Sequence, residues 1–93
     1  MGIYHMQPRF ELGRVVATPG AIALGVDLTK FLFRHHCGDW GDELCADDKE
    51  ANEEALEHDA RILSMYRVPS GERIYIITEH DRSITTVMLR EEY

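Results

Sequence analysis

Hydrophobic and polar positions in residues 61–90 predict three β-strands joined by two short turns. The run from Ile74 to Ile77 is apolar at successive positions, so both faces of the middle strand need cover, and we expect helices from the first half of the chain to supply one cover. Pro69 and Gly71 favour a tight hairpin turn. The expected strands are Ile62–Val68, Arg73–Glu79 and Ile84–Leu89.

The first half of the chain predicts one further strand and three helices. Gly13 interrupts the strand pattern and marks a bulge or an edge position. Thr18 and Asp27 are suited to cap the first two helices, and Asp47 and Asp48 suit the positive end of the third. The expected elements are a strand at Phe10–Ala17 and helices at Pro19–Leu24, Leu28–His36 and Ala46–His58.

The apolar stripes of these helices differ in width. The second helix places Leu28, Phe31, Leu32 and His35 on one face, whereas the third has few apolar residues and should face solvent or a partner. The order β-α-α-α-β-β-β predicts a single α+β domain over residues 10–93. We expect an antiparallel β-meander of about four strands, with the first strand added beside it and the helices packed on one face.

Acidic residues are concentrated in one segment. The 93-residue chain has a net charge of −7, from 17 acidic and 10 basic side chains. Ten of the acids and one of the bases lie between Asp39 and Asp59, so this segment carries −9 and the remainder carries +2. The negative electrostatic field of such a segment repels nucleic acid backbones and attracts basic protein surfaces. We therefore expect a basic protein surface as the partner, and no direct contact with nucleic acid.

Two interpretations of the acidic segment stay open. A charge run is usually a solvated face that keeps a protein soluble, but here few opposite charges stand four positions apart to relieve the repulsion. Trp40, the single tryptophan, is expected to fold its loop onto the core rather than to stand exposed as a binding hot spot. The candidate partner-binding residues are Asp39, Trp40, Asp42, Glu43, Asp47, Glu50, Glu53, Glu54, Glu57 and Arg82.

Neither secretion nor a membrane span is predicted. No apolar run approaches the ~20 residues that a spanning helix needs, and the chain does not open with a charged and then apolar leader. Cys37 and Cys45 do not make a disulfide framework. We expect a cytoplasmic protein with a disordered tail at residues 1–9. Because a common cloning site leaves the pair His5-Met6, we hypothesise that residues 1–5 are a cloning remnant.

Metal binding and catalysis have weak support. His35, His36, Cys37 and Cys45 match no established zinc spacing, so we expect neither a metal nor a cofactor. Histidines near a helix C-terminus are favoured when protonated.

The turn at residues 79–83 offers glutamate, histidine, aspartate, arginine and serine, but neighbours in a turn rarely adopt the geometry of a nucleophile, a base and an orienting acid. We expect Asp81 and Ser83 to bond turn amides, and Arg82 to pair with an acid or with a partner.

Several segments resemble a family. The stretches RFELGRVVATPGA, GDWGD, DDKEANEEAL, RILSMY and IYIITEHDRSITTVMLREEY are similar to those of widespread small bacterial proteins of plasmids, integrative elements and phages, usually labelled plasmid-related. The resemblance covers nearly the whole chain from Phe10. It implies a mobile-element setting and brings no catalytic residues with it.

Together these observations predict a non-enzymatic interaction module of a mobile element that docks its acidic segment on a basic surface. The partner implied by that setting is a host defence or DNA-handling protein. The present chain would inhibit it, as an anti-restriction protein, an anti-CRISPR protein or a DNA mimic does. Two alternatives stay open. One is a small hydrolase or nucleotide-acting enzyme that uses the turn at residues 79–83 with His35 or His36, and the other is a homodimer held by sheet edges.

Overall fold

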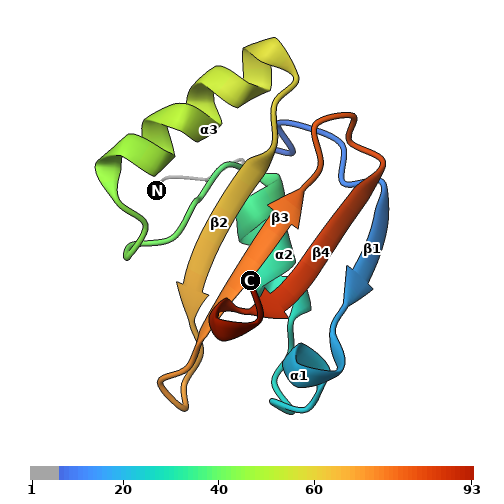
Figure 1. The fold of residues 1–93 in the computed structure, drawn as a ribbon, viewed down its shortest axis with the longest axis vertical. Helices are drawn as coiled ribbons and strands as arrows, with labels where there is room; N and C mark the ends of the chain where they lie inside the picture. Colours follow the sequence, from blue (N-terminus) through green and yellow to red (C-terminus); the bar gives the residue numbers. More distant parts are fainter. Residues whose placement is uncertain (1–6) are drawn as a thin grey trace, which may run out of the picture.

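The computed structural model describes residues 7–93 and confirms the α+β class (Figure 1). Along the chain the elements are β1 (Arg14–Ala17), α1 (Pro19–Ile22), α2 (Thr29–His36), α3 (Ala46–His58), β2 (Ile62–Arg67), β3 (Arg73–Thr78), β4 (Ile84–Leu89) and the 3₁₀ turn η1 (Arg90–Glu92). This is the predicted order, and the bounds of α3 and β4 are the expected ones. The hypothesis about residues 1–5 falls outside the described residues.

The four strands form one sheet in the order β1-β4-β3-β2. The pairs β2–β3 and β3–β4 are antiparallel, which confirms the predicted meander for these three strands. β1 departs from it, because it pairs with β4 in parallel. The three helices and the other two strands intervene between β1 and β4, so the chain has the length that a parallel pairing requires.

β1 is also shorter than the predicted strand at Phe10–Ala17. Gly13 has φ +65°, and a Cβ there would stand 2.4 Å from the carbonyl oxygens of both Arg82 and Ser83. The glycine therefore allows the chain to approach the β3–β4 turn closely, in a left-handed conformation that an extended strand cannot contain. The regular ladder begins only at Arg14, whose amide donates to the Ser83 carbonyl at 2.9 Å.

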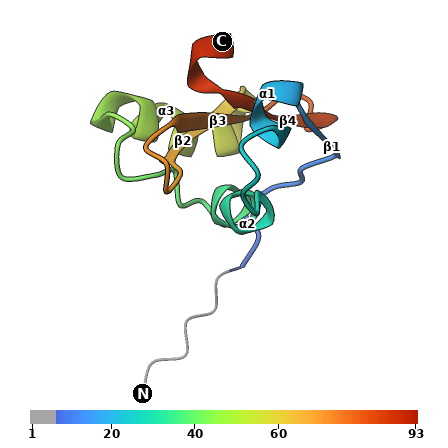
Figure 2. The same ribbon diagram turned by 90° about the horizontal axis from the view of Figure 1, so that it is seen from below.

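One face of the sheet is covered by α2 (Figure 2). The main core lies between them and includes Phe31 of α2 and Ile74, Ile76 and Val87 of the sheet. As predicted, Phe31 and His35 are buried and their stripe neighbours are partly buried in the same layer. On the opposite face, η1 stands over the sheet (Figure 2), and the ring of Tyr93 just after it meets the ring of Tyr75 at 5.5 Å.

The expectation that all helices pack on one face is wrong for α3, which runs beside the outer edge of β2 (Figure 1). The buried side chain of Asn52 donates from Nδ2 to the Leu63 carbonyl at 2.6 Å and accepts from the Leu63 amide at 3.0 Å. A backbone bond at 3.0 Å from the Met65 amide to the Trp40 carbonyl continues the contact. The amide side chain and the loop thus satisfy edge groups that would otherwise be free to pair with another strand.

Candidate functional site

The candidate interaction surface is built on α3, whose two ends are fixed differently. Asp47 and Asp48 occupy its first turn, where the helix dipole favours carboxylates, as predicted. At the other end Asp59 adopts a left-handed conformation with φ 51°. The Arg82 guanidinium donates to the Ala55 carbonyl at 2.8 Å, which also accepts from the Asp59 amide, and to the Ala60 carbonyl at 2.6 Å, so it ties the end of α3 to the β3–β4 turn.

The inner side of α3 is anchored by a second apolar cluster. Ala55 packs with Trp40, Leu44 and Ile62, and Trp40 is only 5% exposed. The Trp40 indole nitrogen donates to Glu53 at 3.0 Å. This confirms the interpretation of Trp40 as a residue that folds its loop onto the core, and it leaves little of that side chain for a partner.

The outer side of α3 carries a stripe of carboxylates at spacings of three and four residues, which places them in one row along the helix. All four side chains are exposed, and none forms an ion pair within residues 7–93. We call this row the acidic stripe; it consists of Asp47, Glu50, Glu54 and Glu57. Because no cation pairs with it in the described residues, the stripe is an uncompensated negative surface, and its neighbouring carboxylates repel each other.

Three other candidate acids are neutralised by arginines of the same chain, and for two of them, Glu43 and Glu53, the arginines lie far away in the sequence. Asp39 accepts from Arg34 at 2.7 Å, and Glu53 accepts from Arg9 at 2.8 Å. In each case a hydrogen bond from the arginine is the main cause that lowers the pKa of the carboxyl group. Arg9 was expected to lie in a disordered tail, whereas its amide also donates to the His36 carbonyl at 2.9 Å.

Glu43 is the third, and it binds two arginines at once. Its carboxylate accepts from Arg67 Nε and from Arg73 Nε, each at 2.6 Å. These hydrogen bonds, the one from Arg67 first, lower the pKa of Glu43 to about 2. The remaining candidate acid of the loop, Asp42, is exposed. The sequence missed these pairings because the partners lie 24 and 30 residues away.

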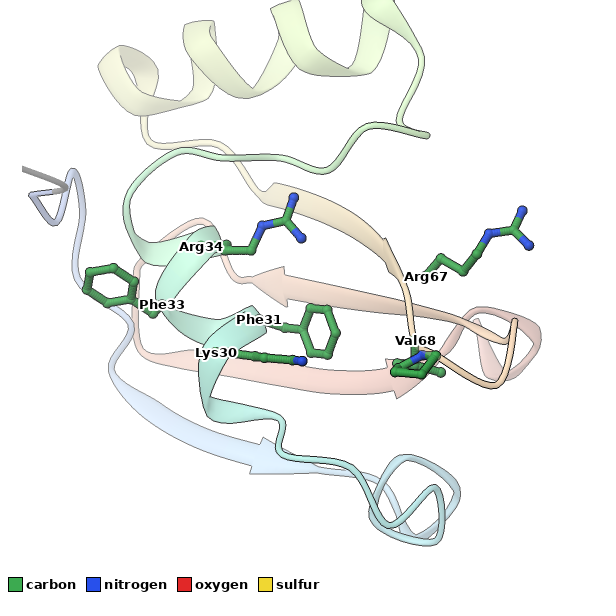
Figure 3. Close-up of a pocket in the computed structure, with 7 residues that line it drawn as sticks. Lys30, Phe31, Phe33, Arg34, Arg67 and Val68 are labelled. Carbon is green, nitrogen blue, oxygen red and sulfur yellow. The ribbon is translucent and has the colours of Figure 1, made fainter. Parts of the chain in front are cut away.

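An open groove of about 660 Å³ lies next to this loop, between α2 and the β2–β3 hairpin (Figure 3). Its lining combines apolar side chains with three cations: Phe31, Phe33, Val68 and Pro69, and Lys30, Arg34 and Arg67. Two of these cations are the arginines that bind Asp39 and Glu43. The groove therefore adjoins the acidic loop, which neutralises most of its positive charge.

The turn at residues 79–83 is built from local hydrogen bonds. Asp81 accepts from the Ser83 amide at 3.0 Å, as predicted, and also from the Ser83 hydroxyl at 2.6 Å. Of the two expectations for Arg82, pairing with an acid is wrong for the described residues, because its guanidinium binds backbone carbonyls instead, and pairing with a partner stays a prediction. This position is structural: it links the turn to the end of α3.

His35, a residue of the alternative enzymatic hypothesis, lies at the centre of a buried hydrogen-bond chain. The hydroxyl of Thr85 donates to the Leu12 carbonyl at 2.7 Å. The Thr85 hydroxyl has a single proton, which is engaged in that bond, so the Thr85 oxygen accepts from the Thr78 hydroxyl at 2.7 Å. Thr78 in turn accepts from His35 Nε2 at 2.9 Å. The unprotonated Nδ1 of His35 accepts from the Ser64 hydroxyl at 2.5 Å.

This chain assigns one tautomer of His35, neutral with the proton on Nε2. The side chain is 0% exposed, and burial, with a smaller contribution from the nearby His36, lowers the pKa of His35 to about 3. The expectation that a histidine at this helix end is favoured when protonated is therefore wrong for His35. Desolvation outweighs the helix dipole because the ring is enclosed, and no substrate can reach it in this conformation.

Within residues 7–93, no three side chains of the metal-ligating types come close enough to hold an ion. None of the helices in the same range combines the length and the apolar composition that a membrane crossing requires. No protein-family model, no curated protein and no solved structure matches the chain.

Proposed function

We propose that the protein is a non-enzymatic interaction module that docks the acidic stripe of α3 on a basic surface of a partner protein. The observation that carries the proposal is the contrast between two groups of acids. Asp39, Glu43 and Glu53 are neutralised by arginines of the same chain, whereas the acidic stripe forms no ion pair in the described residues.

The acidic stripe is costly to the isolated protein. Its three successive neighbour pairs each destabilise a helix by roughly 0.2–0.5 kcal/mol. A basic partner relieves this repulsion and is also attracted from a distance, which raises the association rate. The inner side of α3 is held by Asn52 and Ala55, so the helix presents its outer side on a fixed support.

The partner class follows from the resemblance to proteins of mobile elements. A host defence or DNA-handling protein has a basic surface that normally binds phosphates. Carboxylates spaced along a rigid helix can occupy such a surface in place of phosphates. We therefore propose a cytoplasmic inhibitor of the anti-restriction or anti-CRISPR type, acting through protein contact.

The test is affinity capture from a bacterial host lysate with two matched variants. The first reverses three charges of the acidic stripe, Glu50→Lys, Glu54→Lys and Glu57→Lys. The second reverses three exposed acids outside α3: Glu11→Lys, Glu72→Lys and Glu91→Lys. Both variants have the same net charge, so only the position of the charge differs.

We expect the native protein and the second variant to capture the same basic protein, and the first variant to lose it. Capture should weaken as salt rises, because ion pairs at an exposed surface are screened. Circular dichroism confirms that each variant is folded. If the first variant captures the same basic protein as the second, the acidic stripe is only a solvated face and the proposal is wrong.

A further inference from the structure

The two edges of the sheet differ in how far other parts of the chain cover their backbone groups. At the β2 edge, Asn52 and the Trp40 carbonyl occupy backbone groups of Leu63 and Met65. At the other edge, β1 is the last strand, and both ribbon views show it at the periphery with no element of residues 7–93 beyond it (Figures 1 and 2). Among the described residues, the β1 edge is therefore the one without such cover, and it is open to another strand.

Hydrogen bonds to β4 define which groups of β1 point outward. The amides of Arg14 and Thr18 donate to the Ser83 and Val87 carbonyls, both at 2.9 Å. Backbone groups alternate in direction along a strand, so those of Val16 also face β4. Val15 and Ala17 then direct their N–H and C=O groups away from the sheet. Apolar side chains flank these groups, because Val15 is 43% exposed and Val16 is 37% exposed.

We propose that this open edge pairs with the β1 strand of a second copy of the chain, in an antiparallel arrangement about a two-fold axis at Val16. Val15 of each copy then stands opposite Ala17 of the other, and each of these two pairs exchanges two backbone hydrogen bonds. Val16 meets Val16 of the second copy across the axis. Two four-stranded sheets become one continuous sheet of eight strands.

The distribution of charge favours a second copy as the occupant. α3 with its acidic stripe lies beside β2, at the opposite edge of the sheet, so pairing through β1 keeps the two acidic stripes at the far ends of the dimer (Figure 1). β1 itself carries one charge, Arg14. The two copies of Arg14 are four residues apart along the paired strands, about 13 Å, which exceeds the Debye length of about 8 Å at physiological salt.

The strand has only four residues, so the interface is smaller than that of a standard complex and a weak dimer is expected, with a Kd on the order of 100 µM. This inference does not depend on the proposed docking of α3. If both hold, the dimer presents two acidic stripes, and a partner with two basic sites is bound with greater avidity.

Sedimentation equilibrium of the native chain tests the proposal. The protein concentration runs from about 10 µM to about 1 mM, a range that brackets the expected Kd. The variant Val15→Pro removes an outward N–H and keeps the bonds of Arg14 and Val16 to β4, since proline is tolerated at a strand edge. Val16→Lys places two ammonium groups at the axis. Val15→Thr, which keeps the N–H and the strand propensity, is the control.

We expect the native chain and Val15→Thr to dimerise, and Val15→Pro and Val16→Lys to stay monomeric over the whole range. Amide hydrogen exchange gives a second readout that needs no variant. The amides of Val15 and Ala17 should become about fourfold slower to exchange from 10 µM to 1 mM, because at a Kd on the order of 100 µM the monomeric fraction falls from about 85% to about 20%, whereas the amide of Val16 is protected at both concentrations. A native chain that is monomeric at 1 mM, or a dimer that leaves the Val15 and Ala17 amides unprotected, overturns the proposal.

Discussion

His35 should make the stability of the protein depend on pH well above the range in which carboxylates titrate. Its pKa falls from 6.5 in the unfolded chain to about 3 in the folded one. Because the folded pKa is the lower one, the stability that neutral His35 contributes is complete above pH 6.5 and is lost as the pH falls towards 3. At about 1.4 kcal/mol per pH unit, the loss by pH 5 is about 2 kcal/mol.

The measurement is urea unfolding at pH 7.5 and at pH 5.0, followed by the fluorescence of Trp40, the single tryptophan, which is buried. The variant His35→Gln replaces the imidazole by an amide, which still offers a hydrogen-bond donor and an acceptor but does not titrate. We expect the native protein to lose about 2 kcal/mol of unfolding free energy between the two pH values, and the variant to lose less than about 0.5 kcal/mol. The carboxyl groups of lowered pKa, such as Glu43, titrate below this window.

An equal loss in the native protein and in His35→Gln would refute the assignment of His35 as a buried neutral residue. Nitrogen chemical shifts of the imidazole give an independent check in the native protein. They should show a protonated Nε2 and a bare Nδ1 at pH 6, because the Leu12 carbonyl accepts at the end of the hydroxyl chain. The opposite tautomer would contradict the direction of donation along this hydroxyl chain.

Two further predictions concern the support of α3 and its preceding loop, and both are measured by chemical unfolding. Asn52→Ala should destabilise the protein by about 2–3 kcal/mol, because it leaves the partly buried amide and carbonyl of Leu63 without their side-chain partner. A loss below about 0.5 kcal/mol would mean that water replaces the side chain. Gly41→Ala should cost at least about 2 kcal/mol, since its φ is 99° and a Cβ would stand 1.8 Å from the Met65 carbonyl oxygen. Gly25→Ala is the control, with φ 69° and nothing within 4 Å, and should cost only about 1 kcal/mol; equal costs at the two glycines would exclude the close approach to Met65.

Much of the candidate surface could be predicted from the sequence, because the outward row of α3 follows from helical spacing. Glu50, Glu54 and Glu57 are exposed as that spacing implies. The charge count alone, however, overstated the uncompensated acids. Glu43 and Glu53 depend on Arg67 and Arg9, and no local pattern announces a contact across 24 or 44 residues.

The sequence by itself determined the elements of the protein and their order, since the signals that specify them are local. Thr18 caps α1 by accepting from the Ala21 amide at 3.1 Å, and the turn chemistry separates the three strands of the meander. The tertiary structure alone decided three things: the parallel pairing of β1 with β4, the position of α3 at the edge of β2, and the hydrogen bonds of His35 to Ser64 and Thr78. Each depends on contacts between distant segments, where desolvation and hydrogen-bond satisfaction outweigh local preference.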